Sequence, residues 1–250
     1  MRNVQRDQKG LAVAGKEGQQ HPECQQTLIG PNKFQKLVHV LPFARKGSNQ
    51  YFPNHENYSP MPDHFVDDQH FQDEFFAESG FAAGHYDGCT FERCDFTGVS
   101  LTDCVFVDCR FKSCNLSGTL VLNTAFREVR FEECKALGVQ WTDTNPMLLA
   151  MTFVDCQLNL GNFVGCPLAK SSFQSCTLPE ADFAEADLSG IALTECDLAG
   201  AQFEHTNLTE ADLSSATNYR IDPEQNRIEG AHVSWPEAMG LLHKYGLKWE

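Results

Sequence analysis

No apolar run in the 250 residues approaches the roughly 20 residues that a membrane-spanning helix needs. The longest candidate, residues 37–43, is short, contains Pro42 and lies too far from the first residue to be the apolar part of a signal peptide. We therefore expect a cytoplasmic protein without membrane contact.

Common catalytic motifs are also missing. The sequence contains no glycine-rich phosphate loop, no dinucleotide-binding glycine pattern, no nucleophile turn of the GxSxG type, no HExxH helix and no CxxC pair. Four histidines lie close together in the chain, but their spacing matches no standard metal-ligand pattern, which favours ordinary surface residues: His55, His64, His70 and His85. We expect neither an enzyme nor a bound metal or cofactor.

Positive charge is scarce and unevenly placed. Residues 1–60 hold eight Lys or Arg against four Asp or Glu, whereas residues 61–250 hold eleven against thirty, a net charge of −19 for that part. A body this acidic repels nucleic acid and favours solubility or a basic partner. We expect no direct nucleic-acid binding by residues 61–250.

A large apolar residue recurs at every fifth position over about half of the chain. The series runs from Tyr86 to Trp141, slips by two residues, and resumes from Leu148 to Leu213. Neither an α-helix, with a period of 3.6, nor a flat strand, with a period of 2, keeps such a series on one face. The pattern therefore requires a repeat architecture.

Each five-residue unit has a small residue two positions before the large central one, and mostly polar residues at the other three positions. Ten of the eleven cysteines occupy the small position, Cys24 being the exception. Two interpretations compete: a redox or metal device, or small side chains that fill a narrow interior. The absence of CxxC pairs favours packing, and reduced cysteine fits the cytoplasm.

The second part of the series resembles the pentapeptide-repeat family, whose unit is a small residue, Asp or Asn, Leu or Phe, and two variable residues. The units that carry the resemblance include ADFAE (181–185), ADLSG (186–190), CDLAG (196–200) and TNLTE (206–210). The resemblance implies an all-β fold, a right-handed quadrilateral parallel β-helix with four units in each coil.

Four units of five residues place residue n under residue n+20, or under n+22 across the slip. Large residues then form two columns: Phe91, Phe111, Phe131, Phe153, Phe173, Leu193 and Leu213, and Trp141, Phe163, Phe183 and Phe203. A third column contains Cys94, Cys114, Cys134, Cys156, Cys176 and Cys196. The slip at 142–148 contains the turn signal Asn145-Pro146 and predicts a small bulge.

The chain divides into four predicted segments. Residues 1–60 are a disordered segment, or a leader added by a mis-assigned start upstream of Met61. Residues 61–85, rich in phenylalanine, form an N-terminal cap, and residues 86–217 form the β-helix, about six and a half coils long. Residues 218–250 form a C-terminal strand and helix.

The C-terminal segment predicts a strand at 231–233 and a helix that ends at Tyr245 before Gly246. Ser234 is the expected N-cap, with Pro236 in the first turn and Glu237 completing a capping box. This helix carries an apolar face that covers the last coil, binds a second chain, or does both: Trp235, Met239, Leu242 and Tyr245.

Residues 171–218 contain no Lys or Arg but nine acids, which form a candidate interaction surface: Glu180, Asp182, Glu185, Asp187, Glu195, Asp197, Glu204, Glu210 and Asp212. One interpretation is a solvated surface with Asp as the preferred turn residue, and the other is a negative rod that imitates DNA. Each of the nine acids has a neighbour 20 residues away that is not an acid, for example Asp187 with Asn207 and Glu204 with Ala184. Because stacked like charges destabilise a sheet, any stable rod needs this spacing, and it does not decide between the two.

The resemblance extends over residues 86–250. The tail resembles that of bacterial pentapeptide-repeat proteins that include the microcin B17 immunity protein, and the quinolone-resistance (Qnr) group shares the rod and a C-terminal dimerising element. The resemblance implies a non-enzymatic homodimer that binds DNA gyrase or topoisomerase IV by DNA mimicry and protects it from quinolone-like or microcin-like poisons. The alternative is an interaction scaffold with an unknown protein partner.

Overall fold

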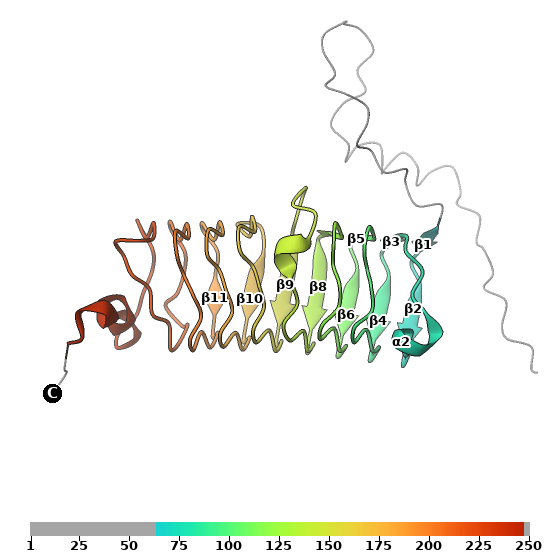
Figure 1. Cartoon of the computed structure of the whole chain (residues 1–250), viewed down its shortest axis with the longest axis horizontal. Coiled ribbons are helices and arrows are strands. Elements are labelled where there is room, and N and C mark those ends of the chain that lie inside the picture. Colours follow the sequence, from blue (N-terminus) through green and yellow to red (C-terminus); the bar gives the residue numbers. More distant parts are fainter. Residues whose placement is uncertain (1–63, 248–250) are drawn as a thin grey trace, which may run out of the picture. The chain divides into compact units, whose positions relative to one another are not determined.

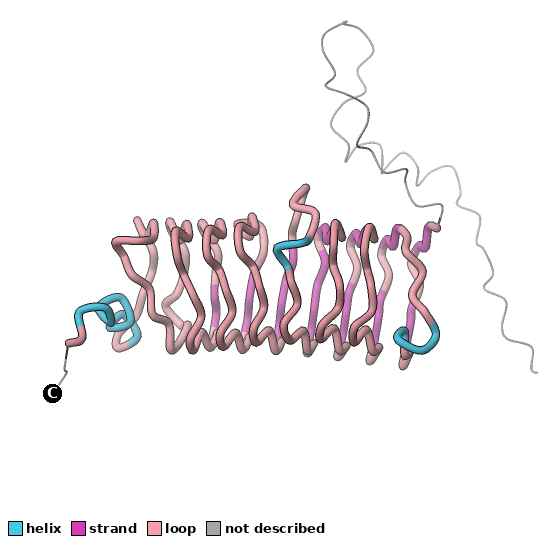
Figure 2. Tube along the Cα trace, in the orientation of Figure 1, coloured by secondary structure: helices cyan, strands magenta, loops and turns pink. Residues whose placement is uncertain are grey.

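The structure is a computed structural model that describes residues 64–247. The predicted leader (1–60), Cys24 and His55 lie outside the described residues. The described chain winds into a parallel β-solenoid whose coils stack along one axis (Figure 1). Strands are short and most of each coil is turn, as Figure 2 shows.

Two faces of the solenoid carry regular parallel sheets. The first face has the order β1-β3-β5-β7, with β1 (Phe65–Asp67), β3 (His85–Asp87), β5 (Val105–Val107) and β7 (Ala125–Arg127). The second face has the order β11-β10-β9-β8-β6-β4-β2, with β2 (His70–Gln72), β4 (Thr90–Glu92), β6 (Arg110–Lys112), β8 (Val129–Glu132), β9 (Met151–Val154), β10 (Ser172–Gln174) and β11 (Leu193–Thr194).

The other two faces are held by isolated parallel bridges. The third face follows Phe75, Asp95, Asn115, Lys135, Gln157, Thr177, Asp197 and Thr217. The fourth face follows Ser100 and Leu120, and then Gln140, Asn162, Asp182 and Gln202. Three short helices interrupt the coils: α2 (Phe76–Ser79), and the 3₁₀ helices η2 (Trp141–Asp143) and η3 (Glu237–Tyr245). Within residues 64–247 no helix is long and apolar enough to span a membrane.

The predicted register is confirmed. Phe91 pairs with Phe111 at a separation of 20 residues, and Phe131 pairs with Phe153 at 22 across the slip. Both predicted columns of large residues form, with stacked ring centroids 4.7 Å apart for Phe91 and Phe111 and 5.0 Å apart for Phe163 and Phe183. These rings are fully buried, so the core is a continuous aromatic and aliphatic stack along the rod axis.

A left-handed backbone at the last residue of most units turns the chain at each corner. Gly98, Asp103 and Asn123 have φ of 66°, 60° and 52°, and lie two positions after the buried central residues Phe96, Leu101 and Val121. Glycine and aspartate adopt this conformation readily and occupy many of these positions, and glutamate occupies six others. We call these positions the corner positions.

The solenoid is longer at both ends than predicted. Residues 61–85, expected as a cap, contribute β1 and β2, which pair with β3 and β4 at a separation of 20 residues. At the other end Asn207 pairs with Arg227 and Asp212 with His232, beyond the predicted boundary at residue 217. Backbone pairing tolerates the irregular sequence of these end coils because it does not depend on side-chain type.

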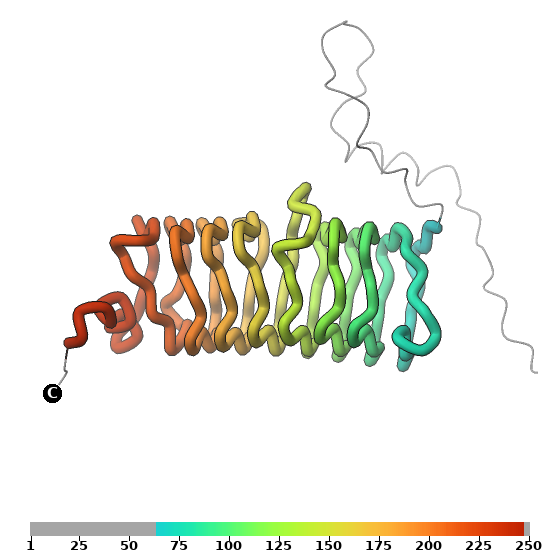
Figure 3. The backbone as a smooth tube through the Cα atoms, in the orientation of Figure 1, coloured from blue at the N-terminus to red at the C-terminus, as the bar shows by residue number. Residues whose placement is uncertain are grey.

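The placement of Leu148 in the core is wrong. Leu148 is exposed at φ 61°, and Leu149 is the buried residue. The two extra residues leave the coil after Thr144, and the loop between η2 and β9 stands out from the rod in Figure 3. The chain rejoins the register where the Ala150 amide donates to the Phe126 carbonyl (3.0 Å). This loop, residues 145–148, is the predicted bulge.

The C-terminal helix begins differently from the prediction. Residues 231–233 form a single bridge at His232 in place of a strand, and no side-chain cap precedes η3. The Glu237 carboxylate accepts a hydrogen bond from the Asn218 amide (3.1 Å) in the last coil. A tertiary contact thus replaces the expected capping box. The expected end is confirmed, since Gly246 is left-handed with φ 60°.

The stacked core makes a prediction about stability. Phe111→Ala removes a ring that lies 4.7 Å from Phe91 and 5.0 Å from Phe131, and should lower the free energy of unfolding by about 3–5 kcal/mol. Denaturant unfolding followed by circular dichroism measures the change. Phe75→Asn is the control, because this 60% exposed side chain should change stability by no more than about 0.5 kcal/mol. Equal losses in the two variants would contradict a continuous core.

Candidate protein-interaction surface

The four aspartates of the predicted acidic surface have a structural role. Each accepts a hydrogen bond from the backbone amide two residues later, for example Ala184 to Asp182 (2.9 Å) and Ser214 to Asp212 (2.9 Å). The same bonds form at Asp187 and Asp197. The Ser214 bonds, with nearby His232, lower the pKa of Asp212. These carboxylates stabilise the turns of the repeat itself.

The glutamates are different. Four of them occupy exposed corner positions at φ between 53° and 59°: Glu180, Glu185, Glu195 and Glu210. Glu204, which is also exposed, lies beside a corner. A left-handed backbone costs about 1 kcal/mol or more for a residue with a side chain of this kind, and Gly or Asn fits better. The repeat therefore does not require glutamate at these corners.

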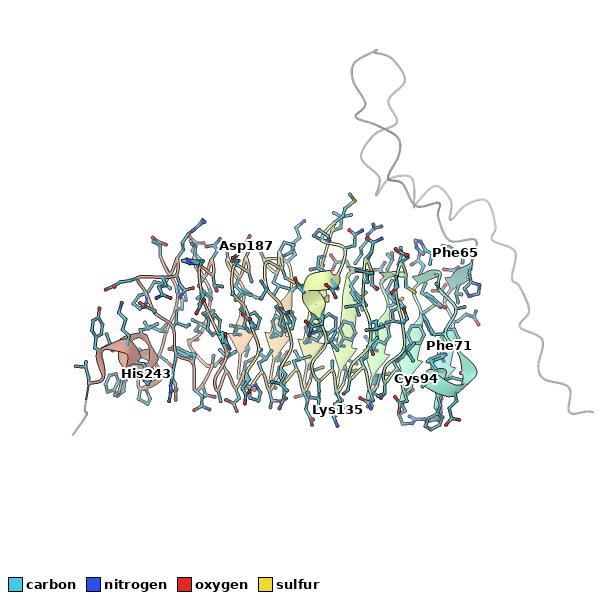
Figure 4. The ribbon with its side chains drawn as sticks, in the orientation of Figure 1. Phe65, Phe71, Cys94, Lys135, Asp187 and His243 are labelled. Carbon is cyan, nitrogen blue, oxygen red and sulfur yellow. The ribbon has the colours of Figure 1, made fainter. Side chains whose placement is uncertain are left out.

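The nine acids do not form one patch. Asp182, Asp187, Asp197 and Asp212 pair within four different columns, one on each face. Each corner glutamate is the last residue of a unit, and the bridges place these four units on four different faces. The four glutamates therefore lie on four different edges of the rod. The prediction of a single surface is thus replaced by negative charge around the whole rod. Figure 4 shows Asp187 on the opposite side of the rod from Lys135.

Neutral or hydrogen-bonding neighbours separate the acids along each column. Asn207 donates to Asp187 (2.8 Å), and Ser175 donates to Glu195 (3.0 Å), each pair separated by 20 residues. Glu180 stacks next to Gly200, which carries no charge. The two residues are close: a Cβ placed on Gly200 would lie 3.4 Å from the Glu180 Cγ. The predicted absence of stacked acids is confirmed for these pairs, and it limits repulsion between coils.

The N-terminal half of the second face has a different electrostatic character. Arg93 pairs with Asp73 (2.7 Å) and Glu92 (2.8 Å), which lowers the pKa of Asp73 chiefly through its hydrogen bond. Glu132 lies between Arg110 (3.8 Å) and Arg130 (2.5 Å), and hydrogen bonding by Arg130 lowers its pKa. Charges here are mutually compensated, in contrast to the acidic half.

The comparisons with known proteins agree with this geometry. A family model described as a pentapeptide repeat region matches residues 85–147 and 145–203. Residues 85–203 are a pentapeptide-repeat region. No curated protein sequence matches the chain.

Two solved structures are similar to this chain. A trypsin-treated variant of QnrB1, a plasmid-mediated fluoroquinolone resistance protein, matches with a TM-score of 0.50 and 20% identity, covering 75% of this chain and 100% of that one. HetL, a pentapeptide repeat protein involved in heterocyst differentiation regulation from the cyanobacterium Nostoc, matches with a TM-score of 0.35 and 12% identity, covering 70% of this chain and 88% of that one. At 20% identity the match to QnrB1 shows the fold alone.

The C-terminal end of the pentapeptide-repeat rod carries the predicted apolar contact. Trp235 is 76% exposed, and Leu242 and Tyr245 are also exposed. Met239 is half-buried and lines a cleft of about 600 Å³ between η3 and the last coil. Gly240 packs closely against Tyr219: a Cβ on residue 240 would overlap the Tyr219 carbonyl oxygen. The helix therefore covers the last coil and still presents apolar side chains.

The histidines do not assemble a site. Residues 64–247 contain no cluster of three or more His, Cys, Asp or Glu with metal-binding geometry. His64 and His70 are exposed, but the surface prediction for His85 is wrong, because it is buried with its ring 4.9 Å from that of Phe65. Burial, with the nearby Arg127 charge, lowers the pKa of His85 and keeps it neutral.

All ten cysteines of the repeat are buried and unbridged. The Cys114 thiol donates to the Phe91 carbonyl (3.3 Å) and the Cys134 thiol to that of Phe111 (3.3 Å). Thr119 occupies the equivalent position and donates to the Phe96 carbonyl (2.8 Å). Cysteine and threonine thus have the same structural role here, which supports the packing interpretation of the column.

Buried thiols make a chemical prediction. Burial raises the pKa of Cys104 to about 11 and that of Cys166 to about 12, so these two thiols hold little thiolate, the reactive form. All ten thiols are buried, which keeps a reagent in solution away from them. In a Cys24→Ser variant, an aromatic disulfide reagent should label no thiol of the native protein at neutral pH. The same reagent should label all ten after unfolding in denaturant without reductant. Rapid labelling of the native protein, or fewer thiols after unfolding, would contradict the packing role.

Proposed function

We propose that the chain is a non-enzymatic acidic rod that binds a type II topoisomerase by DNA mimicry and protects it from quinolone-like or microcin-like poisons. The fold is shared with QnrB1, which is described as a fluoroquinolone resistance protein. The observation that carries the proposal is the density of negative charge along the C-terminal half of the rod.

That density matches duplex DNA. Residues 171–218 span about 2.4 coils, or about 12 Å at about 4.8 Å between coils. Nine acids and no Lys or Arg lie in this length, which corresponds to one negative charge per about 1.3 Å. Duplex DNA carries one per roughly 1.7 Å. A groove with basic walls that accepts DNA would meet a similar field on every side of this rod.

The corner glutamates distinguish acids that serve partner binding from acids that serve the fold. The turn hydrogen bonds explain the aspartates. Glu195 accepts a hydrogen bond from Ser175 of the coil before it, but the turns of the repeat use none of the exposed glutamates at left-handed positions. Retaining glutamate at positions that favour Gly or Asn costs stability. A requirement for surface charge accounts for that cost, so we assign the partner contact chiefly to Glu180, Glu185, Glu195 and Glu210.

A charge-matched pair of variants tests the assignment. Four corner acids of the C-terminal half become asparagine in one variant: Glu180, Glu185, Glu195 and Glu210. Four corner acids of the N-terminal half become asparagine in the other: Asp103, Asp108, Glu128 and Glu133. All eight positions are left-handed, so both variants should fold at least as stably as the natural chain.

The readout is DNA gyrase supercoiling with and without a fluoroquinolone. The natural chain and the N-terminal variant should alter supercoiling or its inhibition by the drug, whereas the C-terminal variant should need about tenfold more protein or show no effect. Equal potency of the two variants would refute the assignment to the corner glutamates. No effect of the natural chain would refute topoisomerase binding and leave the interaction scaffold, with another protein partner, as the function.

We also propose that two copies associate through the exposed C-terminal side chains. Helix η3 covers the last coil but leaves apolar side chains exposed, and a second copy covers them. Trp235, Leu242, Tyr245 and Leu247 are all more than a third exposed at this end.

Removal of the largest of these side chains tests the dimer. Trp235→Ser should shift the molecular mass in light scattering from two chains to one, because it deletes most of the aromatic contact area. Leu160→Gly is the control, since Leu160 is 58% exposed at a left-handed position in the middle of the rod. A dimer that persists in the Trp235 variant would place the contact elsewhere.

A further inference from the structure

An apolar patch on the fourth face is not explained by the repeat. Leu120 and Leu122 flank the buried Val121 and are 58% and 57% exposed. Equivalent positions in other coils of this face are mostly polar: Ser100 and Thr102, Gln140 and Thr142, and Gln202 and Glu204. The same backbone therefore forms without leucine, and folding does not account for the two exposed side chains.

The protruding loop extends this patch. The Asn145 amide donates to the Thr124 carbonyl (2.9 Å), and its side chain donates to Asn123 (3.0 Å), the residue next to Leu122. From this anchor the loop carries two more apolar side chains outward, Met147 at 60% and Leu148 at 44% exposure. The leucine patch is then defined by Leu120, Leu122, Met147 and Leu148.

Negative charge flanks the leucine patch. Asp103 and Asp143 lie one coil before and one coil after Asn123 on the same edge, with Asn123 donating to Asp103 (2.7 Å) and to the Asp143 carbonyl (2.8 Å). Both aspartates are exposed. The outward positions of this face contain no Lys or Arg from Ser100 to Glu204, while Asp182 and Glu204 add acids further along.

We propose that the leucine patch docks a segment of a protein partner in which apolar side chains are flanked by Lys or Arg. The apolar side chains cover the leucines and Met147, and the cations face Asp103 and Asp143. A second copy of the chain fits poorly, because its own acids would face these aspartates in a protein of formal charge −15. This surface lies outside the glutamate corners assigned above, and its occupant does not have to be a topoisomerase.

Substitutions taken from the preceding coil test the proposal without disturbing the fold. Leu120→Ser with Leu122→Thr reproduces Ser100 and Thr102 at the same backbone positions. Phe75→Asn is the control, since Phe75 is 60% exposed on the third face and Asn115 occupies the equivalent position two coils later. Thermal unfolding verifies that both variants are folded.

The probe is a short fluorescent peptide that alternates leucine and lysine, compared with peptides that replace leucine by serine or lysine by glutamate. Fluorescence anisotropy should show binding of the leucine-lysine peptide to the natural chain and to Phe75→Asn, and binding weaker by about tenfold to the double leucine variant. Equal binding of the serine-lysine peptide would overturn the proposal, because attraction to the acidic rod alone would then explain it. Unchanged affinity of the double leucine variant would overturn it as well.

The gyrase assay distinguishes this surface from the proposed function. If the natural chain leaves gyrase unaffected but the leucine-lysine peptide binds as described, topoisomerase binding fails and the leucine patch stands. If gyrase is protected equally by the natural chain and the double leucine variant, and the peptide does not bind, the leucine patch fails and the topoisomerase partner stands.

Discussion

Backbone hydrogen bonding between each residue and the one a coil later is the constraint on which this structure depends. The pairing holds from β1 to His232 and continues through a two-residue insertion. It brings identical positions of successive coils into direct contact about 4.8 Å apart. Large central side chains therefore stack into columns, and charges of one sign cannot follow each other in a column without cost. The acids of the C-terminal half largely follow this rule, whereas Arg110 and Arg130 pair directly in the N-terminal half.

A repeating backbone also provides its own controls, because the same position is occupied by different residues in successive coils. Cysteine and threonine both donate to a carbonyl of the preceding coil, which identifies the cysteine column as packing. Aspartates before the central residue accept hydrogen bonds that stabilise the turns, whereas glutamates at left-handed corners form no such turn bond. Departures from what the repeat needs are therefore the best indicators of interaction. By this criterion the corner glutamates and the leucine patch are set apart from the rest of the surface.

Local signals fail where a tertiary contact competes with them. Glu237 has the spacing of a capping box but accepts a hydrogen bond from Asn218 of the last coil. Leu148 has the spacing of a core residue but lies in the loop, because the insertion frees Leu149 to enter the core. His85 occupies an outward position yet is covered by Phe65 from the coil before it. Each of these outcomes depends on a neighbour that is distant in sequence or displaced by the insertion.

The sequence by itself determined a repeat architecture, because a five-residue period fits neither a helix nor a flat strand. Its resemblance to the pentapeptide-repeat family implied four units in each coil, which gave the register and the burial of ten cysteines. The sequence also located the slip and the end of η3 at Gly246. Only the tertiary structure decided how far the solenoid extends, since backbone pairing recruits irregular segments that lack the period. It also distributed the acids over four faces and brought the loop beside Leu122, because proximity across coils is a property of the winding rather than of any local motif.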